Sequence, residues 1–121
     1  MSSKAKVIGT RAETKVCKYL ESRGIMATRQ ALSGSHDRGD IKIHEPNIII
    51  EVKAGQQTIE PSRKLMNEWL RQTVVEGDNA GCDSVLCIVK YRKAIEDAEV
   101  WIQEKDCRTM MYLDEFCNRF T

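Results

Sequence analysis

Residues 39–53 have the sequence GDIKIHEPNIIIEVK, in which two short apolar runs flank a polar turn. The isoleucines of the two runs favour strands over about residues 39–44 and 47–53, and the segment HEPN at 44–47 is typical of a tight turn. Two strands joined by so short a turn pair antiparallel. The sequence therefore predicts a β-hairpin between residues 39 and 53.

Three polar side chains come together if this hairpin pairs in register. Side chains alternate across a strand, so Glu51 and Lys53 project from the same face of the second strand. The start of the first strand then lies beside the end of the second, which brings Asp40 close to both. Two neighbouring carboxylates repel each other unless one is protonated or a cation lies between them. The hairpin thus predicts a candidate cation site.

The residue types in this group suit a magnesium ion at a phosphate site. Mg²⁺ takes oxygen ligands, keeps several waters, and binds through one or two carboxylates together with phosphate oxygens of a substrate. Lys53 fits such a site because it can orient or deprotonate an attacking water and offset developing negative charge. The alternative is structural: Asp40 caps a strand end, and Glu51 and Lys53 form an exposed ion pair that contributes about 0–1 kcal/mol. The local pattern alone leaves both interpretations open.

A helix and a short strand are expected before the hairpin. Apolar residues recur at every fourth position and Gly24 can end a helix, which predicts an amphipathic helix over about residues 5–23. Its expected buried stripe consists of Ile8, Ala12, Val16 and Leu20. A short strand is expected at about 26–31, and the small and polar residues at 33–39 indicate a loop.

The remainder of the chain alternates helix and strand. Pro61 can open a helix that runs to about residue 79. The β-rich runs at 84–90 and 99–103 predict two further strands, and apolar spacing near the C-terminus predicts a last helix. The apolar face of that helix consists of Leu113, Phe116, Cys117 and Phe120. The order αβββαβ, followed by a strand and a helix, implies a single α/β domain over residues 1–121 with a mixed central sheet flanked by helices.

The composition excludes several classes of protein. With 41% hydrophobic and 31% charged residues, the chain is typical of a soluble globular domain. No run approaches the ~20 apolar residues of a membrane span, and the N-terminal residues do not resemble a signal peptide, so we expect a cytoplasmic protein without membrane contact. The five cysteines are odd in number and include no C-x-x-C pair, so neither a disulfide framework nor a zinc site is indicated.

The formal net charge of +1 hides an uneven distribution. Residues 1–30 hold seven basic residues against two acidic ones, whereas the segment from residue 94 onward holds three basic residues against seven acidic ones. A polyanion is therefore expected to meet the N-terminal region. The sequence contains no helix-turn-helix, zinc-finger or other base-reading motif, which favours recognition of nucleic-acid shape over base sequence.

The hairpin group and the order of elements together resemble the PD-(D/E)xK nuclease superfamily, whose restriction-endonuclease-like core is αβββαβ with an acid on the second strand and E-x-K on the third. Within it the chain is most similar to archaeal- and phage-type Holliday junction resolvases. These carry a glutamate on the first helix, a serine loop, a D-I strand start and an E-V-K strand end. The counterparts here are Glu13, Ser33-Gly34-Ser35, Asp40-Ile41 and Glu51-Val52-Lys53. The similarity covers about residues 5–90.

This resemblance implies a site and its ligands. The catalytic residues it implies are Glu13, Asp40, Glu51 and Lys53. The metal ligands it implies are Asp40, Glu51, Glu13 and the backbone carbonyl of Val52. One or two Mg²⁺ ions per site are expected, with Mn²⁺ able to substitute. Contacts to DNA are expected from Arg11, Arg29, Ser33, Ser35, Arg38, Gln56, Arg63 and Lys64, because phosphate-binding side chains position a protein on DNA; solvated surface polarity is the alternative for each.

The chain departs from the family pattern at the residue before Asp40. The proline in the superfamily's name is Gly39 here, which leaves the loop residue Asp37 as a competing metal ligand. Gln72 corresponds to a glutamine that related nucleases place on the second helix, and it is equally consistent with a surface position. His36 is a candidate phosphate contact or proton carrier, or a bystander in its loop.

The sequence therefore predicts a Mg²⁺-dependent, structure-selective DNA endonuclease that resolves four-way junctions through a metal-activated water. Because resolution requires paired nicks, a two-fold homodimer is expected. The apolar residues that are candidates for its interface, or for the core of one chain, are Trp101, Met110, Met111 and Tyr112. Two alternatives stay open, namely a nuclease of this superfamily that acts on linear, flapped or foreign DNA, and a non-catalytic DNA-binding module.

Overall fold

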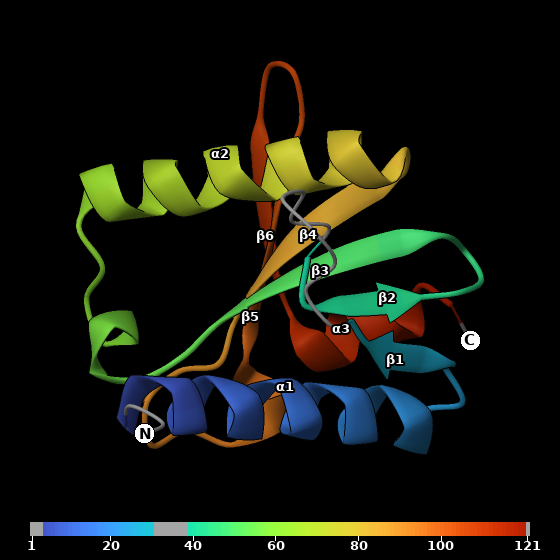
Figure 1. Cartoon of the computed structure of the whole chain (residues 1–121), viewed down its shortest axis with the longest axis horizontal. Helices are drawn as coiled ribbons and strands as arrows, with labels where there is room; N and C mark the ends of the chain where they lie inside the picture. The colour runs from blue at the N-terminus through green and yellow to red at the C-terminus, as the bar shows by residue number, and fades with distance from the viewer. Residues whose placement is uncertain (1–3, 31–38, 121) are drawn as a thin grey trace.

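A six-stranded mixed sheet forms the middle layer of the chain, with helices on both of its faces (Figure 1). This computed structural model describes residues 4–30 and 39–120. The strands follow chain order across the sheet and are β1 (Ala27–Arg29), β2 (Ile41–Ile43), β3 (Ile48–Lys53), β4 (Asp83–Ile88), β5 (Glu99–Gln103) and β6 (Arg108–Tyr112). Neighbouring strands pair antiparallel except β3 and β4, which are parallel.

The parallel pair exists because a helix crosses from one strand to the next. Parallel neighbours cannot be joined by a tight turn, and α2 (Arg63–Ala80) supplies the crossover from β3 to β4. The helix begins at Ser62, whose Oγ accepts a hydrogen bond from the peptide N–H of Leu65 at 3.1 Å. Parallel pairing carries the ends of β3 and β4 to the same edge of the sheet, so the residues that follow both strands lie near the end of the hairpin.

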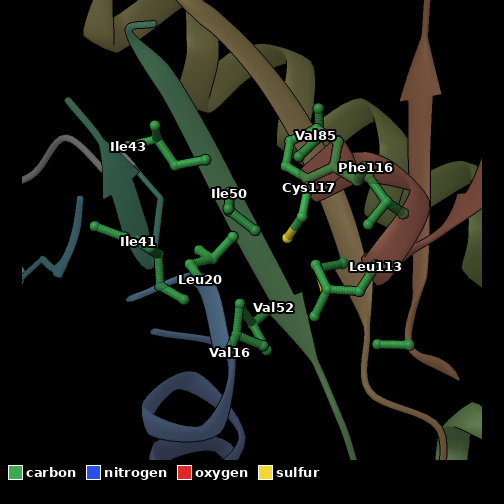
Figure 2. Close-up of a cluster of buried hydrophobic side chains, with 14 of the residues drawn as sticks. Val16, Leu20, Ile41, Ile43, Ile50, Val52, Val85, Leu113, Phe116 and Cys117 are labelled. Carbon is green, nitrogen blue, oxygen red and sulfur yellow. The ribbon is translucent and has the colours of Figure 1, made fainter. Parts of the chain in front are cut away.

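The two faces of the sheet bury separate apolar clusters. The larger cluster packs α1 (Lys4–Ser22) and α3 (Leu113–Asn118) against one face, as Figure 2 shows for Val16, Leu20, Ile50, Leu113 and Phe116. The smaller cluster lies under α2 and consists of Trp69, Leu70, Leu86 and Ile88. Alternation along β3 turns Ile48, Ile50 and Val52 toward the first cluster. Glu51 must therefore project from the α2 face.

The predicted fold class is confirmed. The helices expected at 5–23 and 61–79, the hairpin, and the strands expected at 26–31, 84–90 and 99–103 all form, with bounds that differ by no more than two residues. The hairpin turn occupies 44–47 as expected, and its register joins Ile41 to Ile50 and Ile43 to Ile48. No helix within the described residues is long and apolar enough to cross a membrane.

Two details of the expected fold were wrong. Strand β6 was not predicted, because its sequence RTMMY lacks the isoleucine and valine residues that occur in β2, β3, β4 and β5. It forms by pairing with β5, which buries Met111 in the larger cluster. Ile8 was expected in the buried stripe of the first helix but is 36% exposed, whereas Ala12, Val16 and Leu20 of that stripe are buried.

The four apolar residues that are candidates for a dimer interface or for the core differ in their exposure to solvent. Met111 is buried, and Trp101 packs against the cluster under α2 while its ring N–H donates to Glu99 at 3.0 Å. Met110 and Tyr112 point away from the core on the edge strand β6, with 40% and 45% of their surface exposed. The expected dimer stays a prediction.

Candidate active site

The hairpin brings Asp40, Glu51 and Lys53 together at the point where β2 begins and β3 ends. Glu51 Oε2 lies 3.1 Å from Lys53 Nζ, so the two side chains that alternation places on one face are in contact. Asp40 immediately precedes β2, and its Oδ2 accepts a hydrogen bond from the peptide N–H of Val52 at 2.8 Å. This bond fixes the aspartate carboxylate against the strand that carries the other two groups.

Glu51 occupies an environment that disfavours its charge. Its residue surface is only 3% exposed, and it belongs to the central strand between β2 and β4. Burial, together with the nearby carboxyl groups of Asp40 and Glu76, raises the pKa of Glu51 to about 10. A buried group whose charge is so strongly disfavoured is a strong candidate for binding a cation.

The donor set at Glu51 fits a hard divalent cation. Glu51 Oε1 is buried and accepts no hydrogen bond from any of the described residues, while its neighbours Asp40 and Glu76 offer carboxyl oxygens. Within residues 4–30 and 39–120, no three His, Cys, Asp or Glu side chains stand close enough to form a metal-binding group. Asp40 and Glu51 would supply two carboxylates, which is the number that Mg²⁺ commonly uses in proteins.

Glu13 approaches this group from the other face of the sheet. It lies on α1, and its carboxylate pairs with Arg29 of β1 at 3.3 Å. Partial burial raises the pKa of Glu13, and the Asp40 charge adds to this effect while Arg29 opposes it. The Asp40 charge thus acts on both Glu13 and Glu51, which come from opposite faces of the sheet. Glu13 lies near the site but is held by Arg29.

The backbone at the start of β2 explains why Asp40 approaches β3 so closely. Gly39 is buried and has a φ of +90°, a conformation that L side chains rarely adopt. A Cβ at this position would lie 2.1 Å from Ile49 Cγ2 and 3.3 Å from Glu76 Oε2. Only glycine therefore allows the chain to enter β2 between the neighbouring strand and α2.

Glu76 is a residue of this region that sequence reasoning missed. It lies on α2, is 1% exposed, and its carboxyl group contributes to the raised pKa of Glu51. The signal was present, because Trp69, Thr73 and Glu76 share the spacing of one helix face and all three are buried. An acidic residue on the apolar face of a helix is uncommon enough to mark a site.

Val52 and Gln72 are the remaining expected site residues within the described part of the chain. The N–H of Val52 points toward Asp40, and a residue's N–H and C=O leave a strand on the same side, so its carbonyl is directed there too. Gln72 is half-buried on α2, one turn before Glu76. The roles expected for Ser33, Ser35, His36, Asp37 and Arg38 concern positions outside the described residues.

The expected DNA contacts divide into two groups. Arg11 of α1, Gln56 in the turn after β3, and Arg63 and Lys64 at the start of α2 all have exposed side chains. Arg29 is exposed as well, but its guanidinium is engaged by Glu13. The structure thus leaves Arg11, Gln56, Arg63 and Lys64 accessible to a ligand. Arg29 would have to release Glu13 before it could bind a phosphate.

The raised pKa of Glu51 predicts that the metal-free chain loses stability as pH rises. The folded chain keeps the Glu51 proton up to about pH 10, whereas the unfolded chain releases it near pH 4.5. The folded state therefore binds more protons between these values, and the free energy of unfolding falls by up to about 1.4 kcal/mol per pH unit. Urea unfolding in EDTA at pH 5 and pH 7 measures this slope. Glu51→Gln should remove most of it, and equal slopes in the two proteins would contradict the assignment.

The sheet and its flanking helices form a restriction-endonuclease-like α/β fold. Among solved structures the chain is similar to Hjc, a Holliday junction resolvase from the archaeal hyperthermophile Archaeoglobus fulgidus. The match covers 93% of each chain at 19% sequence identity, with a TM-score of 0.56. No protein-family model and no curated protein sequence matches the chain. At this identity the likeness establishes the fold.

Proposed function

We propose that the chain is a Mg²⁺-dependent, structure-selective endonuclease that cuts four-way DNA junctions by hydrolysis of phosphodiesters. The observation that carries this proposal is the hairpin group, in which Glu51 lies beside Asp40 and Lys53 and has a buried carboxyl oxygen without a donor among the described residues. A DNA-binding module without metal would not need to bury Glu51 next to two further carboxyl groups. The fold that the chain shares with a Holliday junction resolvase supports the junction as substrate.

Each residue of the hairpin group has a distinct task in this mechanism. Asp40, Glu51 and the carbonyl of Val52 would hold Mg²⁺, which when bound lowers the pKa of a water and stabilises negative charge on the phosphate. Lys53 lies at the edge of the group with its side chain 20% exposed, where it can reach both Glu51 and a phosphate from solvent. It orients the attacking water and offsets charge in the transition state. Glu13 has a supporting role from the α1 face.

The basic side chains around the site bind the DNA backbone in this proposal. Arg11 on α1 and the pair Arg63 and Lys64 at the start of α2 are exposed. Phosphate contacts of this kind fix the register of a protein on DNA without reading its sequence. Junction resolution also requires two nicks, so we propose that the chain acts as a two-fold homodimer. Met110 and Tyr112 on the edge strand β6 are candidates for the interface.

A cleavage assay tests the substrate. In Mg²⁺, the wild-type chain is expected to cut an immobile four-way junction at least about tenfold faster than a linear duplex of the same arm sequence, a preference of about 1.4 kcal/mol. Mn²⁺ should support the reaction and EDTA should stop it. Faster cleavage of linear or flapped DNA would point to a repair or restriction type of nuclease, and metal-independent binding without cleavage would point to a DNA-binding module.

A further inference from the structure

Glu76 is an acidic residue where the packing of α2 calls for an apolar one. It lies on the face of the helix that also carries Trp69 and Leu70, which pack on the sheet, and both of its carboxyl oxygens are buried. Burying a carboxyl group is unfavourable unless a specific interaction compensates for it. The groups beside Glu76 should therefore account for the burial of its carboxyl group.

The neighbours of Glu76 are parts of the candidate active site. Its carboxyl group lies beside that of Glu51, and its Oε2 lies 3.3 Å from the Cβ that any residue other than glycine would carry at position 39. Position 39 directly precedes Asp40. Glu76 therefore projects from α2 into the corner between the start of β2 and the end of β3, where Glu51 Oε1 lacks a donor among the described residues.

We propose that Glu76 is a positioning residue of the metal site, whose carboxylate accepts hydrogen bonds from water bound to the metal held by Asp40 and Glu51. This inference rests on the proposed function. A role through water follows from the geometry, because no three acidic side chains among the described residues converge on one metal position. It also follows from the chemistry of Mg²⁺, which keeps several of its waters and is oriented by groups that hydrogen-bond to them.

As a third acidic group beside Asp40 and Glu51, Glu76 has two effects on the site. It adds negative charge beside Asp40 and Glu51, which increases the attraction for a divalent cation in a poorly solvated corner of the fold. It also fixes the orientation of a metal-bound water without taking a ligand position. The substrate phosphate can then occupy the positions that the protein leaves open.

Metal binding by the Glu76→Gln variant tests this role without relying on activity. We expect isothermal titration with Mn²⁺ to show a dissociation constant about 10- to 100-fold higher than that of the wild-type chain, the usual effect of losing such a partner. The variant is nearly isosteric, so its urea unfolding in EDTA should stay cooperative. Glu68→Gln is the matched control, because Glu68 lies on the same helix with an exposed side chain and its loss changes the net charge equally.

Four results are decisive for Glu76. Weaker Mn²⁺ binding by Glu76→Gln, with unchanged binding by Glu68→Gln, supports the inference. Equal affinities of the wild-type chain and Glu76→Gln overturn it, as does loss of cooperative unfolding in EDTA, which would make Glu76 a structural residue. Absence of Mn²⁺ binding by the wild-type chain itself would overturn the proposed function, and the inference with it.

Discussion

Replacing Glu51 with glutamine is expected to lower the rate of Mg²⁺-dependent junction cleavage by about a thousandfold. A bound metal contributes several kcal/mol to stabilisation of the transition state, and about 4 kcal/mol corresponds to that factor. Glu51 is the most buried acid of the hairpin group, and its Oε1 lacks a donor among the described residues, so glutamine removes the charge that a cation needs there. Single-turnover cleavage of a labelled four-way junction in excess protein measures the effect.

The control for this variant comes from the same hairpin. Glu45 is exposed in the turn at the far end of β2 and β3, so Glu45→Gln makes the same change in charge away from the site. It should cleave at the wild-type rate. The Glu51→Gln chain should also remain folded, because the variant removes a group whose burial opposes ionisation. A folded Glu51→Gln chain with wild-type cleavage would exclude Glu51 from the reaction.

Replacing Lys53 with methionine is expected to lower the cleavage rate by about 10²- to 10⁴-fold, the usual contribution of a positioned proton-transfer group. Methionine keeps much of the length and apolar volume of the side chain. Metal affinity should persist or increase, because the Lys53 Nζ that lies 3.1 Å from Glu51 Oε2 competes with a cation for that oxygen. The expected signature is therefore a slow enzyme that still binds Mn²⁺, in contrast to Glu51→Gln.

Two further variants make the lysine result specific. Lys105→Met removes an exposed lysine from the connection between β5 and β6, and it should cleave normally. Lys53→Arg keeps the charge, but a planar guanidinium differs in shape and in hydrogen-bonding geometry from a compact ammonium group. We expect little rescue by arginine. Full rescue by Lys53→Arg would show that Lys53 acts only as a positive charge. Loss of Mn²⁺ binding by Lys53→Met, parallel to its loss of cleavage, would show that Lys53 acts only on the shape of the site.

The hairpin could be predicted from sequence because its determinants are local. Alternation and a short turn fix which side chains share a face, so the contact between Glu51 and Lys53 follows from their positions in one strand. The approach of Asp40 required only the assumption of an in-register pair, which the pairing of Ile41 with Ile50 satisfies. The likeness to a solved structure supports the fold that positions the hairpin.

The contributions of the helices could not be predicted in the same way. Which residues of α1 and α2 reach the hairpin depends on how each helix packs on the sheet, and this is a tertiary property. Glu76 was missed because the apolar spacing of its helix was used only to find the core, whereas the charged residue on that face is the informative one. Glu13 was found through family resemblance, and its contact with Arg29 brings together residues that are far apart in the sequence.

The left-handed backbone conformation of Gly39 makes its replacement by proline unsuitable. Proline fixes φ near −65°, whereas Gly39 has a φ of +90° and no space for a Cβ beside Ile49. The proline of the superfamily's name therefore cannot be introduced here without moving Asp40. Substitution toward a family consensus, which commonly stabilises proteins, would here disrupt the strand entry that supports the site. In this chain, the glycine before the aspartate is required by the backbone conformation at the start of β2.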